Sequence, residues 1–116
     1  MTRNGMVWWI DRWRKSTAWT GMTLEEQGAY RNLLDEAWLR GGAIPNDRRV
    51  LAQASGDPKR WAKVEAKVLA KFRLIQNEYH HETVDDLLAR SQKRAQNQHN
   101  YRERYRRQDD NVTGNT

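Results

Sequence analysis

Basic side chains recur at helical spacing in the segment 59–71, and their chemistry suits the binding of phosphate. Four of them fall on one stripe of a helix at 100° per residue, and Lys59 lies at its edge; the four are Arg60, Lys63, Lys67 and Lys71. The only acidic residue in this segment, Glu65, lies on the other side, so nothing neutralises the row. Lysine suits phosphate better than base edges, because ammonium lacks the bidentate fork of arginine. The stripe predicts contact with nucleic acid; a solvated lysine-rich face is the alternative.

Other basic or polar residues complete the predicted DNA-binding set. They are Arg48, Arg49, Arg73, Asn77, Arg90, Lys93 and Arg94. The first two begin a short predicted helix, where they would bind backbone phosphate or remain plain surface charges. The next two belong to a predicted hairpin that would touch a minor groove or the backbone. The last three open the segment 90–107, which carries seven basic residues and one acidic residue and is expected to meet a polyanion.

Enzymatic motifs are missing from the sequence. There is no Walker A glycine loop, no His-Glu-x-x-His and no serine in a nucleophile setting. His80 and His81 are flanked by acidic residues, but neighbours on a strand point to opposite faces and do not readily chelate one ion. We therefore interpret them as core or surface histidines and expect no enzyme activity, no metal and no cofactor.

The composition limits the class of protein. The chain has 116 residues and a formal net charge of +6, and all six tryptophans lie within the first 61 residues, so we expect the core towards the N-terminus. Cysteine is absent, which excludes disulfides, zinc ribbons and thiol catalysis. No apolar run approaches the roughly 18 residues of a membrane span. These features favour one small domain with room for a tail.

The N-terminal part is expected to run from a strand through a loop into one amphipathic helix. Residues 6–10 have strand character, and residues 11–21 are expected to form a loop. Thr23 and Glu26 have the spacing of a capping box that opens the helix. The helix buries one stripe, formed by Tyr30, Leu33, Leu34, Ala37 and Trp38. Gly41-Gly42 is expected to stop it, because glycine supplies the positive φ of a C-terminal cap.

Two shorter helices are expected next. Ile44-Pro45 should be extended, since a residue before proline avoids the helical region. Asn46 is expected to cap a helix over residues 47–54. Asp57 is expected to cap a third helix, which begins with Pro58 and runs to about residue 71.

A hairpin and a final helix complete the pattern. Residues 72–76 and 79–82 are predicted to be two short strands around Asn77-Glu78, where Asn77 tolerates the left-handed conformation. From Thr83 the apolar spacing is helical again. Beyond Ser91 the apolar stripe ends, which predicts either a helix projecting into solvent or a segment that is disordered until bound.

The order of these elements is typical of a winged helix-turn-helix. The fold class we predict is mainly α with a small β-hairpin or sheet, followed by a C-terminal helix. We expect residues 1–95 to form the winged-helix domain, and residues 96–116 to form a basic polar tail that is a helical extension or disordered.

Several sequence blocks also carry a family resemblance. They are T-L-E-E-Q-G-A-Y-R-N-L-L (23–34), W-L-R-G-G-A-I-P-N-D (38–47), L-A-Q-A-S-G (51–56), Trp61 and V-L-A-K-F (68–72). On these blocks the chain resembles the YdaU-like family of phage and prophage proteins, associated with replication genes, over roughly residues 7–95. The resemblance implies a winged helix, a role near replication initiation and a location in the cytoplasm of a bacterial host. Family members often have a longer C-terminal part thought to engage the helicase machinery.

Three functions remain open from the sequence. The first is binding of double-stranded DNA in replication initiation or its regulation, with the third helix in a major groove. The second is a non-enzymatic adaptor that binds a replication or host protein, with the C-terminal tail as a possible contact. The third is binding of single-stranded nucleic acid by stacking on Tyr101 and Tyr105. The sequence gives no dimer seam, no DNA target and no membrane contact.

Overall fold

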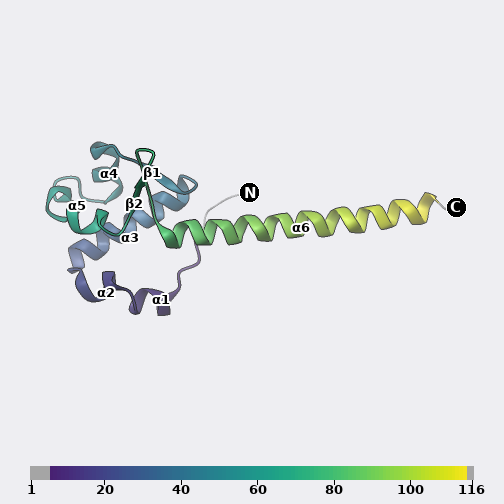
Figure 1. Cartoon of the computed structure of the whole chain (residues 1–116), viewed down its shortest axis with the longest axis horizontal. Coiled ribbons are helices and arrows are strands. Elements are labelled where there is room, and N and C mark those ends of the chain that lie inside the picture. Colours follow the sequence, from purple (N-terminus) through teal and green to yellow (C-terminus); the bar gives the residue numbers. More distant parts are fainter. Residues whose placement is uncertain (1–5, 115–116) are drawn as a thin grey trace.

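The computed structural model describes the backbone of residues 6–114 and the side chains of residues 6–104 (Figure 1). Its elements, in chain order, are α1 (Ile10–Arg14), α2 (Thr17–Gly21), α3 (Leu24–Leu39), β1 (Ala43–Pro45), α4 (Arg48–Ala54), α5 (Trp61–Leu69), β2 (Arg73–Ile75), β3 (Glu78–His80) and α6 (Glu82–Gly114). The predicted fold class is confirmed: the chain is mainly helical, with a small antiparallel sheet and a long C-terminal helix.

The N-terminal segment differs from the prediction. Residues 6–9 are irregular rather than a strand, and residues 11–21 contain the short helices α1 and α2 rather than a loop. Their aromatic content favours a strand locally, but a strand needs a hydrogen-bonded neighbour, and these residues pack their indole rings against the helical core instead. The missed signal was Ser16, which caps α2 by accepting a hydrogen bond from the Trp19 backbone nitrogen at 3.2 Å.

Helix α3 forms as predicted and lies at the centre of the core. Its capping box is complete: the Thr23 nitrogen donates to Glu26 at 2.8 Å, and the Glu26 nitrogen donates to the Thr23 hydroxyl at 3.2 Å. The predicted stripe is buried along its whole length. Gly41 and Gly42 end the helix with φ angles of 89° and 135°, so both glycines are required there.

The three strands form a sheet in the order β1-β3-β2, with every pair antiparallel. Ile44 and Leu74 both pair with Tyr79, one on each side. The predicted turn was placed one residue too late, because the residues with positive φ are Gln76 (52°) and Asn77 (63°), and β3 begins at Glu78. Two consecutive positive φ values make the type I′ turn that matches the twist of a hairpin. With β1 placed between α3 and α4, the arrangement is winged-helix-like.

The starts of the two shorter helices also differ from the prediction. Asp47, and not Asn46, caps α4 by accepting from the Arg49 nitrogen at 2.9 Å, while the Asn46 side chain turns to Asn77. Asp57 makes no side-chain cap. Its carbonyl accepts from the Arg60 nitrogen at 3.1 Å, so residues 58–60 form a turn and α5 begins at Trp61. Bonds of the i to i+3 type then close α5 after Leu69, before the predicted residue 71.

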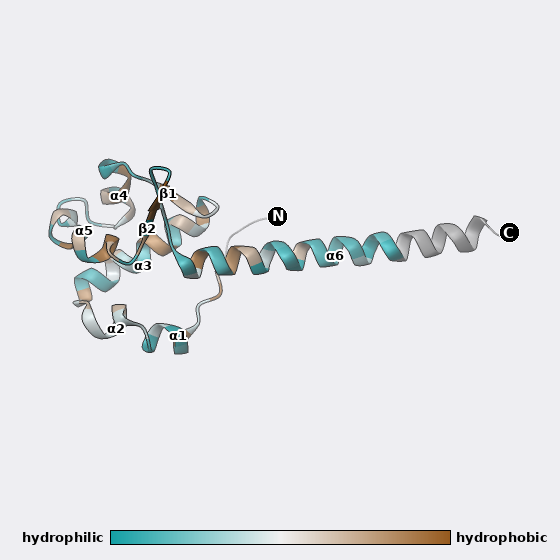
Figure 2. Cartoon of the chain, in the orientation of Figure 1, coloured by the Kyte–Doolittle hydropathy of each residue, from teal (hydrophilic) through white to brown (hydrophobic). Residues whose placement is uncertain are grey.

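Helix α6 begins in the core and leaves it. Val84, Leu87 and Leu88 are buried, and the part beyond them projects along the 72 Å long axis of the molecule (Figure 1). Figure 2 shows the projecting part as hydrophilic up to residue 104, where the described side chains end. Of the two predicted states of the tail, the structure has the helical extension as far as Gly114, and the helix crosses the predicted boundary at residue 95 without a break. Among the described residues, no helix is both long and apolar enough to cross a membrane.

Candidate nucleic-acid interface

Helix α5 has one buried face and one cationic face. Trp61, Val64 and Val68 are at most 4 % exposed and fix the helix on the core, mainly against α3. On a neighbouring face, Lys63 and Lys67 are exposed, and Lys59 extends the same i, i+4 row into the preceding turn. Within the part of the chain that the structure describes, these three lysines form no ion pair. We call them the α5 lysine row: Lys59, Lys63 and Lys67.

The other two members of the predicted stripe are engaged elsewhere. Arg60 bonds Glu25 at 2.7 Å and lies 3.7 Å from Asp57, which ties the start of α5 to the start of α3. The hydrogen bond that Arg60 donates to Glu25, followed by the charges of Glu25 and Asp57, raises the pKa of Arg60. Lys71 is half-buried and donates to the Thr17 hydroxyl. The predicted five-residue stripe is therefore a row of three unpaired lysines flanked by two structural cations.

The predicted contacts on α4 and the hairpin are exposed but differ in their partners. Arg48 forms an ion pair with Glu65 of α5 at 3.3 Å, which holds the two helices together, whereas the Arg49 side chain is exposed. Arg73 is exposed on β2. Asn77, at the hairpin turn, accepts hydrogen bonds from the side chain and the backbone of Asn46 at 3.2 and 3.0 Å. The wing is therefore short and tied to the start of α4.

The predicted contacts on α6 belong to a different part of the molecule. Arg90 lies 3.5 Å from Asp86, and its guanidinium lies 5.1 Å from the centre of the Trp9 ring, so it joins α6 to the N-terminal segment. Lys93 and Arg94 are exposed further along α6. Figure 1 places α5 and the outward course of α6 at opposite ends of the globular part. The structure thus gathers the α5 lysine row on one face and leaves the α6 cations on a separate arm.

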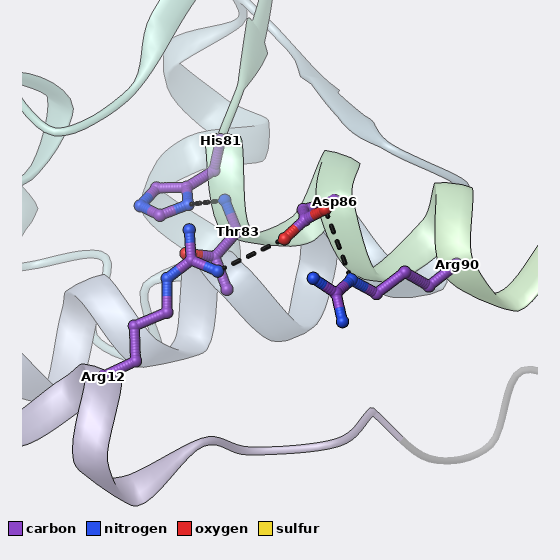
Figure 3. Close-up of polar contacts among 5 residues, drawn as sticks. All are labelled: Arg12, His81, Thr83, Asp86 and Arg90. Atoms are coloured by element: carbon purple, nitrogen blue, oxygen red, sulfur yellow. Dashed lines mark hydrogen bonds and ion pairs between the residues drawn. The ribbon is translucent and has the colours of Figure 1, made fainter.

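A cluster of indole rings and arginines was not predicted. Arg14 stacks on Trp19 at 4.0 Å, and Arg31 stacks on Trp8 at 4.4 Å. An ion pair joins α1 to α6 beside this cluster: the Arg12 guanidinium donates to the carboxylate of Asp86, on the first turns of α6, at 3.3 Å (Figure 3). The interleaving of tryptophan and arginine between residues 8 and 19 was the signal that could have revealed this cluster.

A neutral histidine is buried beneath the cluster. His81 is 8 % exposed, and its Nδ1 accepts from the Thr83 nitrogen at 3.0 Å (Figure 3). The neutral ring therefore donates from Nε2 to the Tyr30 oxygen, 2.7 Å away. Burial, assisted by the nearby charge of Arg12, lowers the pKa of His81 to about 4. Burial also raises the pKa of Tyr30 to about 12. The core interpretation of His81 is confirmed.

Metal ligation has no structural support among the described residues. No group of three or more histidine, aspartate or glutamate side chains is placed there to hold an ion. His80 is half-buried and lies 3.8 Å from Asp85, which is a contact between one histidine and one carboxylate only.

Comparison with known proteins identifies one family. A family model described as "Protein of unknown function (DUF1376)" matches residues 6–89. The match runs from the first described residue to the inner part of α6 and leaves the projecting part of that helix outside. No curated protein matches the chain, and no solved structure matches it.

Proposed function

The chain belongs to the DUF1376 family of proteins of unknown function, and we propose that it is a double-stranded DNA-binding protein of the winged-helix type. The observation that carries this proposal is the α5 lysine row. Lys63 and Lys67 lie on the second helix of a helix-turn-helix and Lys59 in the turn before it, on an exposed face, where a recognition helix would contact the major groove. Exposed lysines without partners are available to phosphates, and each contact releases counterions from DNA.

The surrounding residues suit supporting roles in such a complex. Arg49 on α4 and Arg73 on β2 are exposed and would hold the phosphate backbone. Ala62 and Ala66 are exposed beside the lysines. Because their side chains are short, the backbone of α5 can approach a groove closely. Lys93 and Arg94 on α6 would add electrostatic attraction at a distance from α5.

The biological setting that we propose is replication initiation or its regulation in a phage or prophage. It rests on the resemblance of the quoted sequence blocks to the YdaU-like family and on no structural feature. The cytoplasm of the bacterial host is the corresponding location.

A protein-interaction adaptor is the second candidate, and one feature favours it. Strand β2 lies at the edge of the sheet and exposes Leu74 (52 %) and Ile75 (46 %). Exposed apolar side chains on an edge strand are typical of a surface that pairs with another protein. The third possibility is binding of single-stranded nucleic acid, with bases stacked on Tyr101, which is 66 % exposed. The Tyr105 side chain lies outside the described residues.

Fluorescence anisotropy of labelled DNA over a salt series tests the proposal. We expect the full chain to prefer duplex to single strand, and its affinity to fall steeply with salt. Lys63→Gln should reduce the slope of log affinity against log salt by about 0.9, the value for one phosphate contact. Lys15→Gln is the matched control, because it removes the same charge from the exposed turn between α1 and α2. Absence of duplex binding at low salt would leave the adaptor as the better candidate.

A further inference from the structure

A partly open cavity of about 200 Å³ lies beneath the N-terminal segment. Residues from α1, α2, α3 and the first turn of α6 line it. Three indole rings contribute to its apolar wall, from Trp8, Trp9 and Trp13, and Tyr30 and His81 add two further rings. Arg31 covers one face of Trp8 at 4.4 Å, and Arg12 and Arg90 lie 5.3 and 5.1 Å from the centre of the Trp9 ring, so a flat ligand ring would meet the ring edges and the uncovered faces.

Two cations reach this cavity from different elements. Arg12 comes from α1, and Lys71 follows α5, where its ammonium is held by the Thr17 hydroxyl. Two acidic residues lie nearby: Glu82 is part of the lining, and Asp86 pairs with Arg12 at 3.3 Å. The Arg12 and Asp86 side chains are both 40 % exposed, so their ion pair is weak, and the guanidinium has further N–H groups free to bind an anion.

The charge of Arg12 also acts on the inner wall of the cavity. Burial is the larger cause of the low pKa of His81, about 4, and the charge of Arg12 is the second cause. The imidazole is therefore neutral. The charge of Arg12 likewise opposes the rise that burial produces in the pKa of Tyr30. Both effects show that the charge of Arg12 reaches the inner wall of the cavity, where it favours an anionic group and is opposed by the carboxylates of Glu82 and Asp86.

We propose that this cavity binds a nucleotide, with the base among the indole rings and the phosphate between Arg12 and Lys71. A phosphate group carries enough charge to engage both cations, and charge-assisted hydrogen bonds to phosphate are among the stronger polar contacts. Nucleobases stack on aromatic side chains regardless of their identity. A free mononucleotide and an unpaired nucleotide within a strand present the same chemistry to the cavity. The site is distinct from the α5 lysine row and does not depend on duplex binding.

Isothermal titration calorimetry of the full chain tests this site, with thymidine 5′-monophosphate as the probe. We expect the nucleotide to bind at least tenfold more tightly than thymidine or inorganic phosphate alone, because each of these fills only half of the site. Arg12→Gln and Lys71→Gln should each weaken binding about tenfold. Lys15→Gln, with the same loss of charge next to α1, should leave the affinity within about twofold.

Two results would overturn the proposal. One is no binding of the nucleotide by the folded chain. The other is an equal loss of affinity in Arg12→Gln and Lys15→Gln, which would mean that general charge attracts the nucleotide. A parallel titration with a short oligothymidylate identifies the source of the ligand: if the oligothymidylate binds at least tenfold more tightly than the mononucleotide and Arg12→Gln weakens the binding of both, the ligand is an unpaired nucleotide within a strand. Lys63→Gln should leave nucleotide binding unchanged, so failure of this site and failure of duplex binding are distinguishable.

Discussion

Helices α5 and α6 are both rich in basic residues, yet they stand in opposite structural situations. Helix α5 buries Trp61, Val64 and Val68 and presents its lysines from a fixed position. Helix α6 buries side chains only near its start, and beyond residue 91 its described side chains are almost all exposed. Charge alone therefore does not distinguish an interface from an extension. A buried face distinguishes them, because it determines whether the cations are held in one geometry or only attract a polyanion at a distance.

The largest expected effect comes from removing the anchor of α5. Trp61→Ala should destabilise the protein by about 3–5 kcal/mol, since it leaves a cavity under the helix. Arg94→Ala, on the exposed part of α6, should change the free energy of unfolding by less than about 0.5 kcal/mol. Urea unfolding followed by circular dichroism measures both. Similar losses in the two variants would mean that α6 is as much a part of the folded unit as α5.

Acidification should act at the junction between the core and α6. Because the pKa of His81 is about 4 in the folded chain and about 6.5 when unfolded, the unfolded state binds more protons between these values. This contribution to stability is fully present above pH 6.5 and is lost as the pH falls towards 4, by roughly 3 kcal/mol at most.

Unfolding curves from pH 7 to pH 4 measure this loss. His81→Gln provides the comparison, because glutamine keeps hydrogen-bonding capacity but does not titrate. Its stability should depend less on pH over this range. An unchanged pH dependence would show that other groups produce the effect.

A smaller effect is expected from the capping box of α3. Thr23→Ala removes the hydroxyl that accepts from the Glu26 nitrogen and should cost about 1 kcal/mol. Thr20→Ala is the matched control, since its hydroxyl bonds only to carbonyls of its own helical turn, at 3.4 Å. In thermal unfolding, the melting temperature of Thr23→Ala should be clearly lower than that of Thr20→Ala. Equal melting temperatures of the two variants would mean that the capping box does not stabilise α3.

Local signals in the sequence were sufficient for the elements that carry them. The capping box at Thr23, the Gly41-Gly42 stop and the apolar stripe of α3 all appear where the sequence predicted them. The cap of α4 and the hairpin turn were each predicted one residue away from where they lie, because the Asn46 and Asn77 side chains bond each other. That contact joins residues 31 positions apart, so no local pattern reveals it.

The candidate site was predicted in composition but not in detail. Spacing placed Lys63 and Lys67 on one exposed face, and the structure agrees. Spacing could not predict that Arg60 would pair with Glu25 or that Lys71 would turn to Thr17, because both partners come from distant segments. The cavity under the N-terminal segment was missed for the same reason: its wall is assembled from residues that are far apart in the chain.

We propose that the fixed lysines of α5, and not the cations of α6, bind duplex DNA. Anisotropy titrations of Lys63→Gln/Lys67→Gln and Lys93→Gln/Arg94→Gln test it directly, because both double variants remove two charges from exposed sites. We predict that the α5 variant reduces the salt slope by about 1.8, as for two lost phosphate contacts, and that the α6 variant changes it by less than half as much. An equal loss in both variants, or a larger loss in the α6 variant, would contradict the account.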